Sequence, residues 1–288
     1  MSIGERILLK CGAIALEVAP AFGGRVTRLT HDSVDVLVPL EAQEFHPPFW
    51  PRAGAYPMVP YHNRIEGGRL RLDGCEVALP SHPDAQPHTL HGPAHLAAWQ
   101  VSERNDTTVT LALERAADPH WPWKFSARQT FVITEGGLRL KLSVTNRGET
   151  AMPVGLGWHP YIAGCQRVRH DAEYEWPIRK DYLPTGDRQP VIQAFDENVS
   201  GTHYLSCWSD VQVDTKDDLT LTISASPTMS HLVLHKGDGD FVCIEPVSHL
   251  ANGFNLHARQ ILGTGARILA PVEEMSATIE LNIEKRRS

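Results

Sequence analysis

The sequence predicts an all-β protein, built as one large antiparallel β-sandwich. Three observations support this prediction. Most segments alternate apolar and polar residues, which is the pattern of a strand with one buried face. Turn signals recur every ten to fifteen residues, and the chain holds 22 glycines and 21 prolines, which suits short strands joined by tight turns. In addition, no segment shows a capped amphipathic helix of three turns.

The predicted strands can be followed in chain order. In the first of these, Val109, Leu111 and Leu113 share one face. A second is rich in β-branched and aromatic residues, and the others repeat the alternation. These segments span residues 107–114, 125–134, 138–144, 219–223, 231–236, 241–247 and 276–284. Strands recur from the first fifty residues to the last twenty without a low-complexity linker or a repeat, so we expect one domain over residues 1–288.

Two segments, residues 41–63 and 80–99, do not fit the strand pattern. Both are rich in proline, histidine and aromatic residues. Long loops in a compact domain are usually functional or disordered, and the aromatic content argues against disorder. We therefore expect ordered, functional loops.

Composition and charge exclude several classes of function. The net charge of −7 is spread along the chain, and no basic block offers a footprint for nucleic acid. No apolar run reaches the ~18 residues of a membrane span. The first residues lack a signal-peptide core, so a cytoplasmic protein is expected. Five cysteines without a CxxC pair indicate reduced, mostly buried thiols.

The long loops contain the first candidate site residues. Asn63 and Arg64 end the first loop, and arginine offers a rigid fork of donors for hydroxyl or carboxylate oxygens; a surface arginine is the alternative. His91 lies in a histidine-rich stretch of the second loop. The spacing of these histidines does not match a metal site, and local evidence alone favours a solvated histidine, followed by one that makes hydrogen bonds.

Two further candidates follow from the chemistry of burial. His159 is flanked by Trp158 and Tyr161 and followed by a proline, so partial desolvation could place its pKa where proton transfer works best. Glu245 lies inside a hydrophobic strand, where burial would raise its pKa and make it a base near pH 7. The alternatives are a core histidine and a glutamate on an edge strand that faces solvent.

Aromatic residues suggest where a sugar could stack. Trp121 and Trp123 lie among prolines, and a flat aromatic face accepts the apolar C–H face of a sugar ring. A purely structural role in the core is an equally good interpretation.

Taken together, the short motifs resemble the aldose 1-epimerase (galactose mutarotase) family from about residue 12 to residue 283. Each is weak alone, but they follow the family's order and approximate spacing. They are Gly24-Arg-Val-Thr-Arg-Leu, Tyr56-Pro-Met-Val-Pro-Tyr-His-Asn-Arg-Ile, Leu90-His-Gly, Trp99, Gly157-Trp-His-Pro-Tyr and Ile244-Glu-Pro.

The resemblance implies a large twisted antiparallel β-sandwich whose concave face binds a free aldose. It also implies that His159 protonates the ring oxygen, while Glu245 takes the proton of the C1 hydroxyl. His91 would help to hold and polarise the sugar. The mechanism that the resemblance implies requires no cofactor and no metal, because both of its steps are proton transfers. The substrate-binding residues expected beside these three are Asn63, Arg64, Trp121, Tyr161 and Asp196, the last because its stretch is similar to one that holds a sugar hydroxyl.

Three alternatives remain at this stage. The first is a non-catalytic sugar-binding module, which would not need a matched acid–base pair. The second is a metal-dependent β-barrel enzyme that uses the histidine cluster. The third is a mutarotase for hexose 6-phosphates, with Arg69 and Arg71 as phosphate ligands, although a solvated strand face is the better interpretation of that pair. A monomer or a homodimer is expected.

Overall fold

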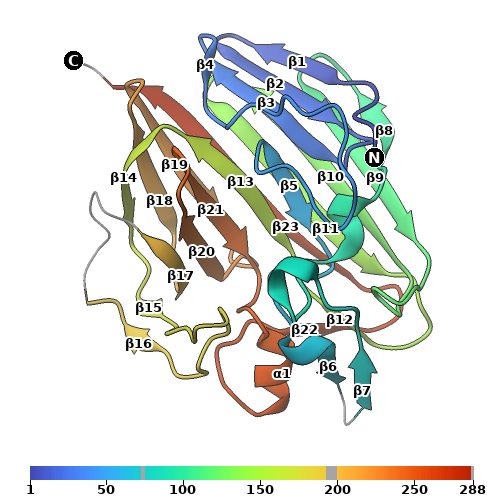
Figure 1. Ribbon diagram of the computed structural model, residues 1–288. Coiled ribbons are helices and arrows are strands. Elements are labelled where there is room, and N and C mark those ends of the chain that lie inside the picture. The colour runs from blue at the N-terminus through green and yellow to red at the C-terminus, as the bar shows by residue number, and fades with distance from the viewer. Residues whose placement is uncertain (73–74, 193–199, 287–288) are drawn as a thin grey trace.

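The computed structural model describes residues 1–72, 75–192 and 200–286, and it confirms the all-β sandwich. Two large sheets pack face to face (Figure 1). Sheet I has eleven strands. In spatial order these are β1 (Ile7–Cys11), β2 (Ile14–Ala19), β3 (Arg25–His31), β5 (Ala55–Met58), β13 (Gly157–Ala163), β21 (Phe241–Val247), β20 (His231–Lys236), β17 (Gly201–Ser206), β15 (Tyr174–Glu175) and β16 (Gln189–Pro190), with β4 (Val34–Asp35) paired to β3.

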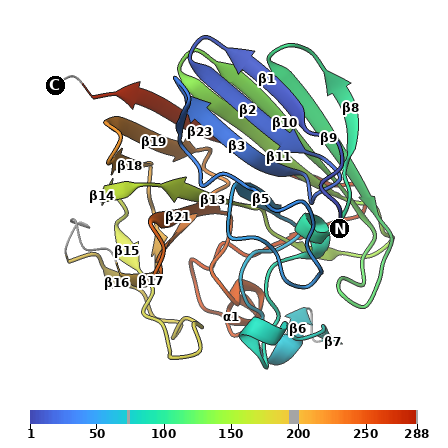
Figure 2. The ribbon, with the colours of Figure 1, turned by 45° about the horizontal axis from the view of Figure 1, so that its top comes forward.

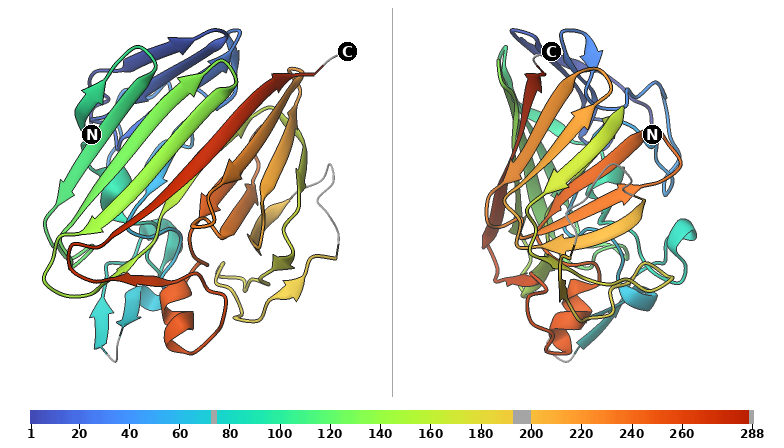
Figure 3. Two further views of the ribbon diagram at one scale, coloured as in Figure 1. Left: turned by 180° about the vertical axis from the view of Figure 1, so that it is seen from behind. Right: turned by 90° about the vertical axis from the view of Figure 1, so that its left-hand side faces the viewer.

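Sheet II forms the other layer and faces the viewer in the left panel of Figure 3. Its order is β14 (Cys165–His170), β18 (Asp210–Thr215), β19 (Leu219–Ala225), β23 (Glu274–Lys285), β11 (Gly137–Asn146), β10 (Phe125–Thr134), β9 (Thr108–Arg115) and β8 (Gln100–Arg104). Neighbouring strands in both sheets pair antiparallel. The predicted strands 125–134, 231–236 and 241–247 have the bounds that the sequence indicated.

The main core lies between the two sheets and is made from alternate residues of each strand. In β21, Val242 and Ile244 point into this core, whereas Cys243 and Glu245 point to the opposite face of sheet I. That second face is also covered, by a smaller cluster that includes Tyr56, Tyr161 and Tyr204. Because both faces of sheet I are buried here, β13 and β21 lack the apolar–polar alternation of a half-buried strand.

Short elements cluster at one end of the sandwich, at the bottom of Figures 1 and 2. They are the hairpin β6 (Arg69–Leu72)–β7 (Cys75–Ala78), the pair β12 (Met152–Val154)–β22 (Arg267–Leu269), and α1 (Gly253–Ala258). The six residues of α1 are the one α-helix among the described residues, as the lack of helical periodicity predicted. No helix in the described part of the chain is long and apolar enough to cross a membrane.

The two long loops are ordered, but the expectation that neither contains a strand is wrong for the first. Residues 55–58 form β5, which lies between β3 and β13 in sheet I. Two prolines flank or interrupt this short strand, so its sequence lacks a strand pattern. The second loop contains only 3₁₀ turns, η2 (Pro83–Ala85) and η3 (Pro93–Leu96); a third, η1 (Glu66–Gly68), precedes β6.

The cysteines are free thiols where the structure describes their side chains, but the expectation that most are buried is wrong. Only Cys243 is buried, Cys11 and Cys165 are half-buried, and Cys207 is exposed.

Candidate active site

The candidate site is built on two rows of cross-strand neighbours on the covered face of sheet I. In the first row, Tyr56 of β5 pairs with His159 of β13, and Val233 of β20 pairs with both Glu245 of β21 and Tyr204 of β17. The register of β13 with β21 pairs Gly157 with Val247 and Tyr161 with Cys243, which places His159 opposite Glu245. The second row contains Thr202, His235, Cys243 and Tyr161.

Both rows open into a cavity of about 520 Å³. This volume lies within the usual range for a small-molecule site. The lining mixes aromatic, polar and charged side chains, which suits a ligand with apolar faces and hydroxyl edges. It consists of Phe49, Trp50, Arg52, Tyr56, Asn63, Arg64, Asp84, Leu90, His91, His159, Tyr161, Tyr182, Thr202, Tyr204, Val233, His235, Gly237, Asp238, Gly239, Phe241, Cys243 and Glu245.

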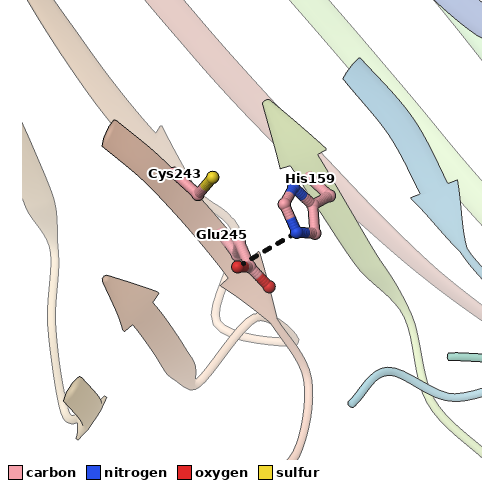
Figure 4. Close-up of side chains that lie close together, drawn as sticks. All are labelled: His159, Cys243 and Glu245. Carbon is pink, nitrogen blue, oxygen red and sulfur yellow. Dashed lines mark ion pairs between the residues drawn. The ribbon is translucent and has the colours of Figure 1, made fainter. Parts of the chain in front are cut away.

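His159 and Glu245 contact each other in this cavity, as Figure 4 shows. His159 Nε2 lies 3.3 Å from Glu245 Oε1, and the side chains are 10% and 4% exposed. Glu245 therefore does not occupy an edge strand facing solvent, because β21 lies inside sheet I between β13 and β20. Glu245 Oε2 and His159 Nδ1 are buried and have no hydrogen-bond partner among the residues that the structure describes. A buried polar atom without a partner is costly, so an unpaired oxygen on the cavity-lining Glu245 favours the binding of a ligand that can donate to it.

Burial shifts the proton affinity of both groups. Desolvation raises the pKa of Glu245 to about 8, and the positive charge of Arg64 partly opposes this shift. Desolvation also holds the pKa of His159 well below its usual range, helped by His235 and Arg25. Near pH 7 both shifts favour a neutral imidazole beside a protonated carboxyl, so the pair carries a single proton.

His91, Asn63 and Arg64 form one hydrogen-bonded unit at the cavity wall. The backbone N–H of Asn63 donates to His91 Nδ1 at 3.0 Å, and the backbone N–H of His91 donates to the Asn63 carbonyl at 2.9 Å. Because Nδ1 accepts, a neutral His91 carries its proton on Nε2 and presents a donor. Asn63 Oδ1 accepts from the Arg64 backbone N–H and from Arg64 Nη1, at 2.9 and 3.3 Å.

Aromatic rings hold the imidazole of His159 in place. Tyr56 stacks on it with ring centroids 4.6 Å apart, and Tyr161 stacks on it at 4.8 Å. The ring of His91 meets it edge-on at 5.6 Å. Trp50 lies against Tyr56 and His91 and lines the same cavity. The packed rings restrict rotation of the His159 ring.

The thiol of Cys243 lies beside the acid–base pair in Figure 4. Its sulfur and the nearest ligand atoms of His159 and Glu245 lie within 4.8 Å of one another, the one group among the described residues with spacing for a shared metal ion. Desolvation raises the pKa of the Cys243 thiol well above its usual range, and that of Glu245 is also raised. Two of the three groups therefore favour their protonated forms, which compete with metal binding. The arrangement suits proton transfer better than metal coordination.

The expectation that Trp121 binds substrate is wrong for the described structure, because its ring lies in the main core and not in the cavity. Asp118 Oδ1 accepts hydrogen bonds from the backbone N–H groups of His120 and Trp121, and this turn directs Trp121 inward. There the ring packs against Tyr61 and Trp123, at 5.3 and 5.1 Å.

Other predicted positions have mixed outcomes. Asp196 lies outside the described residues. Arg69 and Arg71 both pair with Glu76 on an exposed hairpin, at 2.5 and 3.2 Å, and do not line the cavity. The local expectation of solvated histidines in the second loop is wrong, because His82, His88, His91 and His95 are all buried. Trp50 covers His82, His91 and His95, and brings the two long loops together.

Several cavity residues were not identified from the sequence. Cys243, His235, Thr202 and Tyr204 share the face of Glu245 because of the register of β17, β20 and β21. A signal existed for one of them, since Cys243 is two residues from Glu245 and the alternation puts both side chains on one face. No sequence pattern marks Tyr182, which a loop brings to the cavity.

The architecture is that of a galactose mutarotase-like β-sandwich. A galactose mutarotase-like protein from Clostridium acetobutylicum superposes with a TM-score of 0.81 at 20% identity, covering 97% of this chain and 95% of the other. Galactose 1-epimerase from Lactobacillus acidophilus superposes with a TM-score of 0.80 at 15% identity, covering 98% and 95%. At such identities the likeness establishes the fold.

The chain belongs to the aldose 1-epimerase family, whose model matches residues 6–282. Among proteins of known sequence, it is 27% identical over 251 residues to the uncharacterized protein YphB of Escherichia coli strain K12. That match covers 81% of this chain and 84% of YphB.

Proposed function

We propose that the protein is an aldose 1-epimerase that interconverts the α and β anomers of a free aldose. The observation that supports this most directly is the buried contact of His159 Nε2 with Glu245 Oε1, 3.3 Å apart in a cavity on this family's fold. Opening a sugar ring requires one group to protonate the ring oxygen and another to remove the proton of the C1 hydroxyl. These two oxygens are both bonded to C1, so the catalytic groups must be close neighbours.

In the proposed mechanism, protonated His159 donates to the ring oxygen while the Glu245 carboxylate takes the C1 hydroxyl proton. The C1–ring oxygen bond breaks and C1 becomes the aldehyde carbon. Rotation about the C1–C2 bond turns the other face of the aldehyde to the ring oxygen. In closure, neutral His159 recovers its proton and protonated Glu245 returns its own. The overall reaction consumes no proton and involves no change of oxidation state.

The shared proton explains how one pair can serve both half-reactions. The neutral imidazole and protonated carboxyl that burial favours are the arrangement needed for closure. Opening needs the tautomer in which the same proton lies on His159. Transfer across the 3.3 Å contact interconverts the two arrangements without exchange with solvent.

The remaining residues have roles that their positions support. His91 would donate from Nε2 to a sugar hydroxyl, and Arg64 would donate to another from the cavity wall. Asn63 fixes both residues through its backbone and its side chain. Tyr161 would contact the sugar beside His159. Asp196 is proposed from the sequence alone.

Exchange spectroscopy by NMR tests this function on the wild-type protein. Saturation of the α-anomer H1 signal should transfer to the β-anomer faster with protein than without it, for at least one of galactose, glucose, xylose, arabinose and fucose. A sugar-binding module would bind without accelerating exchange. Acceleration confined to hexose 6-phosphates would favour the phosphorylated substrate instead. The cavity contains Arg52 and Arg64 but also Asp84 and Asp238, and this balance of charge favours a neutral sugar.

A further inference from the structure

Arg25 is a fully buried arginine, and it is not among the residues that form ion pairs in the described part of the chain. Its Nη1 donates to the carbonyls of Ala53 and Pro51, at 2.9 and 3.2 Å, whereas Nε and Nη2 have no hydrogen-bond partner among the described residues. Its relative exposure is 0%, and no carboxylate in the described part of the chain forms an ion pair with it. Burying an unpaired charge is expensive. The fold therefore keeps this cation at a cost to stability.

Arg25 is separated from the acid–base pair by Tyr56, because β3 and β13 lie on opposite sides of β5. It belongs to β3, next to β5 in sheet I, and its guanidinium lies 4.5 Å from the centroid of the Tyr56 ring. Tyr56 in turn stacks on His159 at 4.6 Å with an interplanar angle of 21°. Arg25 does not line the cavity. Any influence on the reaction must therefore pass through the Tyr56 ring and through the electric field.

The environment of His159 contains few other fixed charges. The polar and titratable groups around it come from β5, β13, β20, β21 and the two long loops; they are Tyr56, His62, Arg64, His91, His95, Tyr161, His235, Cys243 and Glu245. Desolvation lowers the pKa of His62, His91, His95 and His235, so these histidines stay neutral near pH 7. Arg64 is half-buried at the cavity wall, and the other charged residues of the lining, Arg52, Asp84 and Asp238, are exposed, so solvent screens their charges. Arg25 is wholly buried and acts unscreened.

The His159–Glu245 pair needs a nearby positive charge in order to remain singly protonated. A pair that takes up a second proton holds an imidazolium and a protonated carboxyl, and then no base remains for the C1 hydroxyl. Burial already raises the pKa of Glu245 to about 8, which keeps the first proton bound near neutrality. A positive charge close to His159 disfavours the second.

We propose that Arg25 is a positioning residue that acts through Tyr56, placing a buried positive charge behind His159 and so preventing the His159–Glu245 pair from taking up a second proton. The inference rests on the proposed role of that pair in proton transfer. Removal of the charge should move both limbs of the pH–rate profile to higher pH, because every protonation of the pair becomes easier. A shift of about one pH unit is expected, because the charge lies 4.5 Å from the Tyr56 ring and that ring lies 4.6 Å from the His159 ring, inside the protein.

The test uses two neutral variants and two controls in the full-length protein. Arg25→Gln keeps a donor for the Ala53 carbonyl, and Arg25→Met removes it. Arg25→Lys keeps the charge. Arg28→Gln removes an arginine from the same strand, but one that is exposed and paired with Asp35 at 2.7 Å. The first measurement is the side-chain NMR titration of His159, and the second is the pH–rate profile.

The expected result is a His159 midpoint about one pH unit higher in Arg25→Gln and Arg25→Met than in the wild type, with Arg25→Lys and Arg28→Gln unchanged. The proposal is overturned if His159 gives the same titration curve in the wild type and in a folded neutral variant. This includes the case in which neither protein shows a titration step for His159. A wild-type His159 that is half-protonated at about pH 6.5 or above also overturns the proposal, a result that needs no variant. The titration decides the role of Arg25 whether or not the protein accelerates anomer exchange, so failure of the proposed function is seen separately.

Discussion

His159 and Glu245 come from distant parts of the chain, yet face each other across neighbouring strands with Nε2 and Oε1 3.3 Å apart. Each also keeps one buried polar atom, Nδ1 of the histidine and Oε2 of the glutamate, without a partner in the described part of the chain. Native structures satisfy most buried polar groups, so the unsatisfied oxygen of the cavity-lining Glu245 indicates a place for a ligand atom. A sugar hydroxyl can donate to Glu245 Oε2 while its neighbouring ring oxygen faces His159.

Replacement of Glu245 by glutamine should lower turnover by about 10²-fold or more, because an amide of the same shape cannot accept the C1 hydroxyl proton. Polarimetry of a freshly dissolved sugar measures the rate of anomer exchange. Glu76→Gln makes the same chemical change on an exposed hairpin and should retain wild-type turnover. A folded Glu245→Gln protein with wild-type turnover would remove Glu245 from the mechanism.

Replacement of His159 by asparagine should also reduce turnover by about 10²-fold or more, since asparagine cannot donate a proton to the ring oxygen. The same polarimetric assay applies, and circular dichroism checks that the variant is folded. His120→Asn is a suitable control, because His120 is exposed in a turn and does not line the cavity. Equal activity in the two variants would contradict the role given to His159.

Turnover should fall as the pH rises through about 8, the value to which burial raises the pKa of Glu245. Below this value the pair holds one shared proton. Above it the proton is lost, and no acid remains for the ring oxygen. Initial rates between pH 6 and pH 10, corrected for the spontaneous reaction, measure this limb. A rate that stays constant to pH 10 would show that the shared proton is not required.

Glu245→Gln should be more stable than the wild type at alkaline pH. The unfolded glutamate ionises near 4.5, whereas the folded one holds its proton to about 8. The folded state thus binds more protons in this window, so the wild type loses stability as the pH rises through it. The glutamine is neutral throughout, and its advantage at pH 9 should reach a few kcal/mol, on the order of the free energy of the shift. The urea midpoints of the wild type and of Glu245→Gln are compared at pH 4.5 and at pH 9. If the two proteins differ by the same amount at both pH values, Glu245 is not a buried, protonated group.

Treatment with EDTA followed by dialysis should leave anomer exchange unchanged, because the proposed steps use only side-chain protons. The neutral forms favoured by Cys243 and Glu245 compete with metal binding at the one described group of suitable spacing. Inactivation by EDTA that a divalent ion reverses would support a metal at His159, Cys243 and Glu245 instead.

Much of the fold followed from the sequence because strand formation depends on local pattern. The segment 125–134 alternates under a fixed period of two, and β10 has the same bounds. β5 could not be recognised, because four residues among prolines have no period and form a strand only between β3 and β13. Trp121 was misassigned because composition does not show which way a turn points a ring. The Asp118 turn points this ring into the core.

The sequence by itself determined the identities of the chemical groups. The motifs around His91, His159 and Glu245 supplied a donor, an acid and a base of the right kinds, and the hydrophobic neighbours of Glu245 already indicated a raised pKa. Only the tertiary structure decided that these groups meet. Their contact depends on the pairing of β13 with β21, a long-range register that a shift of one residue would reverse from one face of the sheet to the other. A different pairing, that of β3 with β5, brings Arg25 to the Tyr56 ring, and no local pattern connects Arg25 with His159. Proton affinity depends on burial and on neighbouring charge, and both are properties of the packed sheets.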